Sequence, residues 1–311
     1  MVWNVGISVN SPKIAHYHLP GLFEFYEFYT EFLPLWRQHR DWFYDWCDIA
    51  SIYGAPEGSL WGGGRTSFGN ADTRDILKLT EKYDISARLT FSNSLLREEH
   101  LADKKCNELC QLFENAKIPS GVIVHSDLLV DYLKEKYSDL YLISSTTKVL
   151  TNFDDFRAEL DRPDFKYVVP DFRLNKSFDQ LASLTQEEKN KVEFLCNECC
   201  DIKCSSRKAC YENVSLKNLA TAGEKIPDHK CTSPEGQGGY KFSKAMKNPA
   251  FISIEDIQKT YLPMGFTNFK LEGRGLGSAI LLEFILYYMA KPEHHIEVRE
   301  AIYLDAMLDL F

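Results

Sequence analysis

Short apolar runs rich in β-branched and aromatic residues alternate along this chain with longer segments in which apolar residues recur every three or four positions. The first pattern predicts buried strands, and the second predicts amphipathic helices. Segment 103–116 illustrates the second, because Cys106, Leu109, Cys110 and Phe113 fall on one helical face. Eight cycles of strand and helix can be counted in this way.

The predicted strands are Trp3–Val9, Asp48–Tyr53, Ile85–Phe91, Gly121–His125, Tyr141–Ser144, Tyr167–Val169, Val192–Cys196 and Thr267–Leu271. The predicted helices lie near 20–46, 72–83, 100–117, 126–137, 152–162, 175–190, 254–262 and 276–290. Strands separated by helices pair in parallel through right-handed crossovers, and eight such units close into a barrel. We therefore expect an α/β fold, a (β/α)8 TIM-type barrel that forms a single domain over residues 1–311.

One long stretch, residues 197–252, interrupts the alternation after the seventh strand. It contains five cysteines and the polar, glycine-containing run 233–240. Loops of this length inside a compact domain are usually functional, and the loops that follow barrel strands are those that build active sites. We therefore predict that 197–252 is a cysteine-rich metal-binding insertion within the barrel.

The cysteines of this insertion are candidate metal ligands. Sets of four thiolates select zinc or an iron–sulfur cluster. We predict that Cys200, Cys204, Cys210 and Cys231 hold one metal centre. Their spacing leaves iron and zinc both open, because a zinc ribbon normally shows two tight CxxC pairs and only one is present, at 196–199. Whether a cysteine of that pair replaces one of the four also stays open.

Composition narrows the classes of function. The hydrophobic content is 44% and the charged content 26%, as in globular proteins with a substantial core. The net charge of −9 does not favour binding to nucleic acid. The longest apolar run, 279–290, is interrupted by Glu283, so no membrane segment is expected, and residues 1–10 do not resemble a signal peptide. We expect a cytoplasmic protein, in which nine cysteines indicate metal or redox chemistry rather than disulfides.

Polar residues follow several of the predicted strands, at the barrel end that hosts catalysis. His125 is a candidate proton shuttle, or a hydrogen-bonded residue without a chemical role. Glu198, Glu272 and Arg274 are the other candidate catalytic residues, and the last two either pair with each other or bind an anionic substrate. Lys270 is expected to point into the barrel, where it needs a carboxylate partner such as Glu198.

Two further features lie near the N-terminus. His16 and His18 are expected to follow the first strand and to reach the same rim. The segment from Leu22 to Trp46 is unusually aromatic. We expect it to pack against the barrel, with docking of a partner chain as the alternative.

Two segments resemble a known family. The closing strand and its exit, Gly265–Arg274, resemble the G-x-x-x-x-K-[IL]-E-G-R ending of the collagenase-like peptidases, family U-32. The run Asn197–Arg207 is similar to the family's N-E-x-C-x3-C-P-x-R segment, with Ser205 in place of the proline, and Cys210-Tyr211 stands where the family has His-Tyr. Although the family name denotes proteolysis, the resemblance implies a [4Fe-4S] cluster held by four cysteines. It also implies oxygen-independent hydroxylation of quinone precursors or RNA bases.

Three functions therefore remain open. The first is an iron–sulfur barrel enzyme with redox or hydroxylation chemistry on a small or macromolecular substrate. The second is a metal-dependent peptidase, although no GxSxG, HExxH or P-loop motif supports it. The third is a non-catalytic, metal-stabilised subunit that binds a partner protein through its aromatic N-terminal helix.

Overall fold

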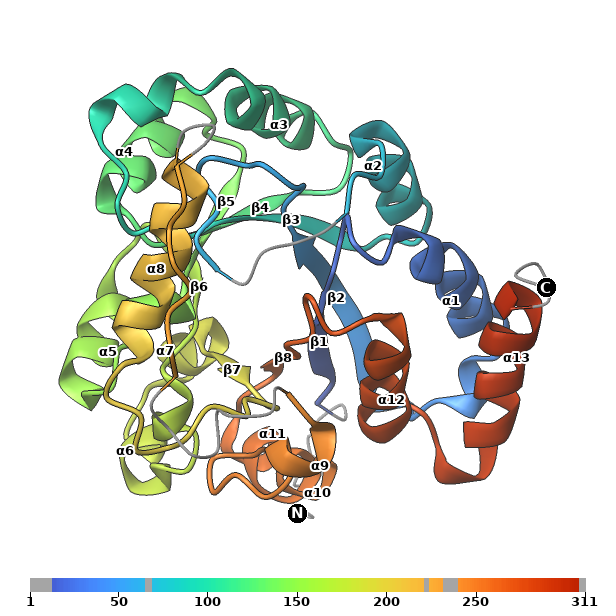
Figure 1. The fold of residues 1–311 in the computed structure, drawn as a ribbon. Helices are drawn as coiled ribbons and strands as arrows, with labels where there is room; N and C mark the ends of the chain where they lie inside the picture. Colours follow the sequence, from blue (N-terminus) through green and yellow to red (C-terminus); the bar gives the residue numbers. More distant parts are fainter. Residues whose placement is uncertain (1–12, 65–68, 221–223, 232–239, 308–311) are drawn as a thin grey trace, which may run out of the picture.

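Eight parallel strands form one sheet that curls into a barrel. The computed structural model describes residues 13–64, 69–220, 224–231 and 240–307. The strand order is β6-β5-β4-β3-β2-β1-β8-β7. A parallel bridge between Val168 and Val192 joins the two edges, so the barrel is almost closed (Figure 1). The predicted (β/α)8 fold is confirmed.

The strands are short, as in most barrels of this kind. Their bounds are β1 Ala15–Pro20, β2 Cys47–Gly54, β3 Ser86–Phe91, β4 Gly121–Val124, β5 Tyr141–Ser144, β6 Phe165–Val168, β7 Glu193–Leu195 and β8 Asn268–Lys270. The second to eighth predicted strands overlap β2 to β8.

The first strand differs from the prediction. Trp3–Val9 lies outside the described residues, and β1 is the later segment Ala15–Pro20. Tyr17 packs into the core beneath the helices, whereas His18 points into the barrel. Because polar residues occupy its inward positions, β1 lacks the apolar run that marks the other strands. His16 and His18 therefore lie within the strand and do not follow it.

Helices and short helical turns surround the strands. Their bounds are α1 Tyr26–Gln38, η1 Arg40–Trp42, α2 Thr73–Lys82, η2 Glu98–Ala102, α3 Lys104–Glu114, α4 Asp127–Lys136, η3 Thr146–Lys148, α5 Phe153–Asp161, η4 Phe172–Leu174, α6 Phe178–Ala182, α7 Gln186–Lys191, α8 Arg207–Leu219, α9 Phe242–Ala245, α10 Ile254–Asp256, η5 Ile257–Tyr261, α11 Leu262–Met264, α12 Ser278–Tyr288, η6 Pro292–His294 and α13 His295–Met307. The apolar pattern does not predict α8, because its buried residues include only Arg207 and Ser215.

The apolar core has two parts. The larger lies between strands and helices and includes the aromatic residues of α1, among them Phe28, Phe32 and Trp36. The aromatic N-terminal segment therefore packs against the barrel, as expected. The smaller part fills the barrel interior with residues from five strands or strand exits: Tyr53, Ile123, Ile143, Val169 and Leu195. None of the helices that the structure describes has the length and apolar character needed to cross a bilayer.

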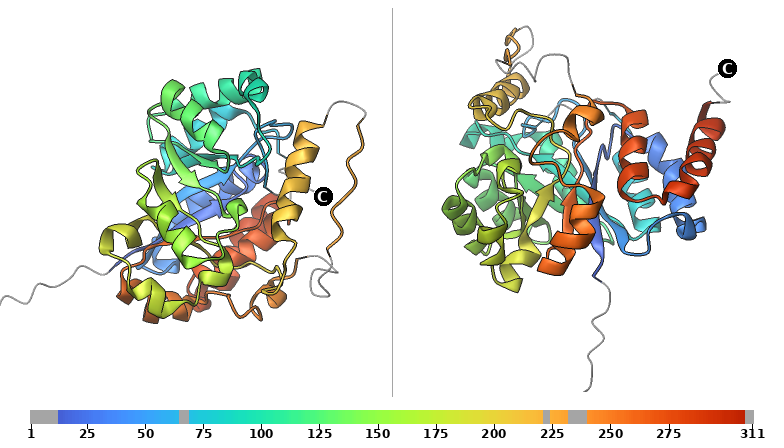
Figure 2. Two further views of the ribbon diagram at one scale, coloured as in Figure 1. Left: turned by 90° about the vertical axis from the view of Figure 1, so that its left-hand side faces the viewer. Right: turned by 90° about the horizontal axis from the view of Figure 1, so that it is seen from below.

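The insertion after β7 leaves the barrel over its mouth and contains helix α8. We call residues 199–231 of this insertion the excursion. Helix α8 rises beside the barrel, and segment 224–231 returns alongside it in the opposite direction (Figure 2). Asn213 joins the two, because its Nδ2 donates to the carbonyl of Pro227 at 2.9 Å and its Oδ1 accepts from the N–H of His229 at 3.1 Å. The Nδ2 of Asn218 donates to the carbonyl of Gly62 at 2.8 Å, which ties α8 to the exit of β2.

Candidate functional site

A small cavity lies at the C-terminal end of the barrel, the end at which barrel enzymes carry their active sites. Its volume is about 50 Å³, which is room for roughly three to five water molecules. Helix α8 contributes Tyr211 to its wall. The strands and their exits contribute the rest of its lining: Tyr53, Gly64, Thr90, Ser92, Ile123, Ser145, Thr146, Thr147, Val169, Leu195, Lys270, Glu272, Gly273 and Arg274.

Hydrogen bonds join the residues that follow β7 to those that follow β8 at this cavity. The Nδ2 of Asn197 donates to the carbonyl of Glu272 at 3.0 Å, and its Oδ1 accepts from the N–H of the same residue at 2.8 Å. The hydroxyl of Tyr240 donates to the carbonyl of Asn197 at 3.0 Å. Burial is the largest cause that raises the pKa of Tyr240, and the charges of Glu272 and Cys199 add to it. These groups therefore converge on one point of the rim.

Two of the predicted catalytic residues belong to one cluster. The ligand atoms of Glu198, Cys199 and Glu272 all lie within 4.8 Å of one another. Two carboxylates and a thiol at this spacing are able to hold a divalent ion such as zinc. Cys199 is not one of the four predicted ligands, although its position next to Glu198 at a strand exit is a signal that could have identified it.

A buried ion network fixes the start of the excursion. Glu198 receives a guanidinium nitrogen of Arg207 at 2.7 Å and the N–H of Cys200 at 2.9 Å. Arg207 also approaches Asp171 at 3.4 Å, and Asp171 approaches Arg173 at 3.5 Å. Because Asp171 follows β6 and Glu198 follows β7, this network anchors the cysteine segment to two strand exits.

Two of the four predicted cysteine ligands lie inside this network. Cys200 and Cys204 are half-buried. Burial raises the pKa of Cys200 to about 12, Arg207 acts against this, and the nearby Cys204 adds to it. The backbone carbonyl of Cys204 accepts from Arg173 at 2.8 Å. Both thiols therefore belong to the anchored part of the excursion.

The other two predicted ligands are exposed on the excursion. Cys210 lies in the first turn of α8, and Cys231 ends segment 224–231, which returns toward that same turn. No three of the four sulfurs in this described region come within 4.8 Å of one another. A four-iron cluster takes one thiolate on each iron and spaces its ligands more widely than a single ion does.

Arg274 spans the opening of the cavity. Its Nη1 donates to the hydroxyl of Thr90 at 3.1 Å, and its guanidinium lies 5.6 Å from the ring centre of Tyr53. A Cβ atom at Gly64 would stand 2.5 Å from its Nη2. Any side chain at position 64 would therefore displace the guanidinium. Arg274 and Glu272 both line the cavity, as the motif at the exit of β8 predicts.

A charged layer lies deeper in the barrel. Glu193 is fully buried and contacts Arg88 at 2.6 Å, Lys270 at 3.0 Å and His18 at 3.5 Å. Lys270 therefore points into the barrel as expected, but its carboxylate partner is Glu193 and not Glu198. The prediction failed on this point because Glu198 follows β7 and turns toward Arg207, whereas Glu193 is an inward residue of the strand itself.

His125 stands beside the cavity. Its Nδ1 lies 2.9 Å from the hydroxyl of Thr147, which lines the cavity, whereas His125 itself is not among the lining residues. Burial is the main cause that lowers the pKa of His125 to about 4, and the charges of Lys148 and Lys208 act in the same direction. The imidazole is therefore neutral at pH 7 and serves as a hydrogen-bonding partner of Thr147.

This lowered pKa predicts a pH dependence of stability. The unfolded chain binds a proton at His125 below its ordinary pKa of about 6.5, whereas the folded chain binds it only below about 4. The free energy of unfolding should therefore fall between pH 6.5 and 4, by about 3 kcal/mol from this group. Urea titrations of the wild type and of His125→Gln at pH 7 and pH 4 measure the difference. Parallel pH profiles of the two proteins would contradict the assignment.

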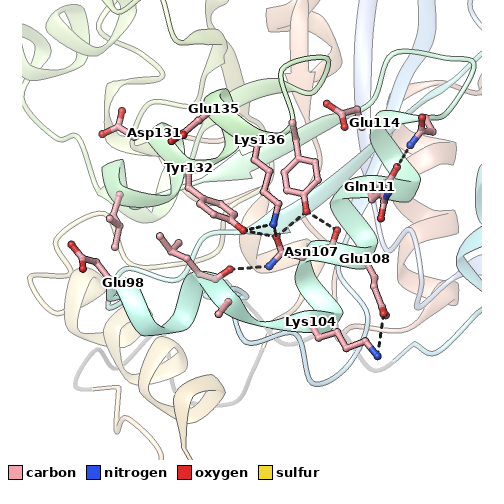
Figure 3. Close-up of a pocket in the computed structure, with 15 residues that line it drawn as sticks. Glu98, Lys104, Asn107, Glu108, Gln111, Glu114, Asp131, Tyr132, Glu135 and Lys136 are labelled. Carbon is pink, nitrogen blue, oxygen red and sulfur yellow. Dashed lines mark hydrogen bonds and ion pairs between the residues drawn. The ribbon is translucent and has the colours of Figure 1, made fainter.

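A larger concavity lies elsewhere on the described structure. It is an open groove of about 1120 Å³ on the outer face of α3 and α4 (Figure 3). Its polar groups contact each other: Lys136 reaches Asn107 at 2.9 Å and Tyr132 at 2.7 Å, and Lys104 reaches Glu108 at 3.6 Å. A groove that faces away from the strand ends and satisfies its own polar groups is a poor candidate for catalysis, despite its size.

Comparisons with known proteins bear on the fold. No family model matches the sequence, and no curated protein matches it. Among solved structures, the chain is similar to one described as "The Structure of the U32 Peptidase Mk0906", with 12% identity and a TM-score of 0.50. The match covers 84% of this chain and 93% of that one. The chain has the fold of a U32 peptidase.

The two segments that resemble the U32 family meet in this fold. Asn197–Arg207 follows β7, and Gly265–Arg274 contains β8 and its exit. The paired hydrogen bonds between Asn197 and Glu272 connect them directly. The second segment lines the cavity, and the first is hydrogen-bonded to it at Glu272, although the two lie far apart in the sequence.

Proposed function

We propose that this chain is an iron–sulfur barrel enzyme that carries a [4Fe-4S] cluster on Cys200, Cys204, Cys210 and Cys231. It performs redox or oxygen-independent hydroxylation chemistry on a small organic molecule or a nucleobase at the barrel mouth. The single observation that carries the proposal is the position of α8. Cys210 in its first turn directly precedes Tyr211, a wall residue of the cavity.

The residues present fit such a cluster. The donor set is four thiols, none of them in a disulfide, and sets of four thiolates hold [4Fe-4S] clusters. Burial raises the pKa of Cys200 to about 12, and the guanidinium of Arg207 opposes this rise, which offsets part of the cost of forming the thiolate that a metal needs. When bound, the cluster supplies single electrons beside the cavity.

The protein's own residues act on the substrate. Arg274 and Lys270 present positive charge to the cavity and bind an anionic or carbonyl oxygen. Glu272 presents a carboxylate to the same cavity as a proton acceptor, and Tyr211 covers the cavity and excludes water. The cavity in the described state takes only a small group, so a larger substrate inserts one end.

Anaerobic reconstitution with ferrous iron and sulfide tests the cluster. We expect broad visible absorbance and about four iron atoms and four acid-labile sulfides per chain. Cys200→Ser and Cys204→Ser should lose most of the iron. Cys199→Ser is the matched control, since it alters a neighbouring half-buried thiol outside the proposed set, and it should retain the cluster. A colourless wild type with stoichiometric zinc would refute the proposal.

A second candidate, a metal-dependent peptidase, is favoured by the cluster of Glu198, Cys199 and Glu272. Two carboxylates and one thiolate leave a zinc ion with an open position for water. This candidate predicts the reverse pattern: Cys199→Ser loses stoichiometric zinc and peptide cleavage, whereas Cys200→Ser keeps both. Absence of cleavage across a peptide panel, with zinc bound, would exclude it.

A further inference from the structure

Lys270 carries the one amine among the described residues that line the barrel-mouth cavity. It is the last residue of β8, and strand ends of this kind carry catalytic groups in barrel enzymes. Its Nζ lies 3.0 Å from Glu193 below and 3.8 Å from the ring centre of Tyr53, another lining residue. The lysine therefore forms the floor of the cavity, between the buried charged layer and the ligand space.

The surroundings favour the neutral, nucleophilic form of this amine. The Lys270 side chain is only 6% exposed, and the guanidinium of Arg88 contacts the same Glu193 carboxylate at 2.6 Å, so the amine is desolvated beside a second cation. An ordinary lysine has a pKa of about 10.4 and is almost wholly protonated at neutral pH. Desolvation and neighbouring cations are the two ways in which proteins activate lysine as a nucleophile.

We propose that Lys270 captures a small aldehyde or ketone in this cavity as a covalent iminium. The lysine nitrogen forms a bond to the carbonyl carbon, and the carbon–oxygen bond breaks. The two protons that the ammonium gives up leave with the carbonyl oxygen as water. The reaction is a condensation that needs no oxidant or reductant, and it is independent of any cluster on the excursion.

The buried charges remain balanced through this step. The ammonium and the iminium both carry one positive charge, so Glu193 keeps its cation and the ring of Tyr53 keeps its partner. A neutral product at this position would leave the Glu193 carboxylate with only Arg88 and His18 as its partners among the described residues. The site therefore accommodates an iminium better than an amide or another uncharged adduct.

The volume and charge of the cavity limit the ligand. Space for roughly three to five water molecules admits a carbonyl compound of about that many non-hydrogen atoms. Arg274 also lines the cavity and presents a guanidinium, which pairs with a carboxylate. Glyoxylate meets both conditions and is the probe of choice.

Reductive trapping tests the proposal on the intact, folded protein. Glyoxylate and sodium cyanoborohydride are added at pH 8, and the modified lysines are mapped by mass spectrometry of peptides. We expect Lys270 to be labelled at least about tenfold faster than Lys104, whose side chain is 88% exposed. Denatured protein should lose this preference. Lys270→Arg preserves the charge beside Glu193, and it should abolish the fast label while Lys104 is still labelled slowly.

The mapping on the wild type keeps the test decisive if Lys270→Arg does not fold. Labelling confined to exposed lysines such as Lys104, or labelling of Lys270 only after denaturation, would overturn the proposal. Failure of iron reconstitution would leave it unaffected, because the condensation uses no metal. The outcome of one test therefore does not decide the outcome of the other.

Discussion

Replacement of Glu193 by glutamine should lower the free energy of unfolding by about 3–5 kcal/mol, because it leaves two buried cations without their carboxylate. Glu193 is fully buried, and it is the acid that contacts both Arg88, at 2.6 Å, and Lys270, at 3.0 Å. Burial alone would raise the pKa of Glu193, but the charges of His18, Lys270 and Arg88 hold it far below its usual range. Urea unfolding at pH 7 measures the loss.

The pH profile of the same variant provides a second check. A carboxylate whose pKa is depressed by folding contributes stability above its ordinary pKa of about 4.5, and that contribution is lost as the pH falls toward the folded-state value. The deficit of Glu193→Gln should therefore be constant near neutral pH and should shrink in acid. Glu255→Gln is the matched control, since Glu255 pairs with Lys259 at the surface, and it should leave stability unchanged. Equal effects of the two substitutions would contradict the network.

Replacement of Arg207 by glutamine should lower the free energy of unfolding by a similar amount, about 3–5 kcal/mol. The Arg207 side chain is only 4% exposed, and its guanidinium lies between Glu198 at 2.7 Å and Asp171 at 3.4 Å. Without it, two buried carboxylates of the barrel mouth repel each other. Because Arg207 is the first residue of α8, the excursion should also detach from the strand exits.

Limited proteolysis distinguishes this local effect from a general loss of stability. Arg207→Gln should be cleaved rapidly within residues 199–231, while the barrel remains resistant. Arg97→Gln is the control, because Arg97 pairs with Glu99 at the surface at 4.0 Å and lies outside the excursion. An excursion that stays as resistant as in the wild type would mean that Arg207 does not anchor it.

The sequence pattern predicted the strands best where both faces are apolar. β4 and β5 contain continuous apolar runs, as in Gly121–Val124 and Tyr141–Ser144, and such runs are visible without tertiary information. β1 was missed because His16 and His18 occupy its inward positions. The burial of His18 is stabilised by Ser51, Asn268 and Glu193 from other strands, and a single segment does not contain that information.

The candidate site was predicted in part. The motif at the exit of β8 pointed to Glu272 and Arg274, and both line the cavity. Glu198 was also predicted, whereas a role for its neighbour Cys199 was left open, because two adjacent cysteines appear alike until the backbone turns their side chains in different directions. The proposed ligation by Cys200, Cys204, Cys210 and Cys231 stays a prediction that awaits metal analysis.

By itself, the sequence determined the number of strand–helix units, the parallel barrel, and the two motif segments at the exits of β7 and β8. These features depend on local periodicity and on short motifs, and both are defined by residues that are close together in the sequence. Only the tertiary structure decided that Glu193 and not Glu198 is the partner of Lys270, and that α8 lies over the cavity. Both are contacts between residues far apart in the chain. The parallel pairing of β7 with β8 produces the first, and the packing of the insertion over the barrel end produces the second.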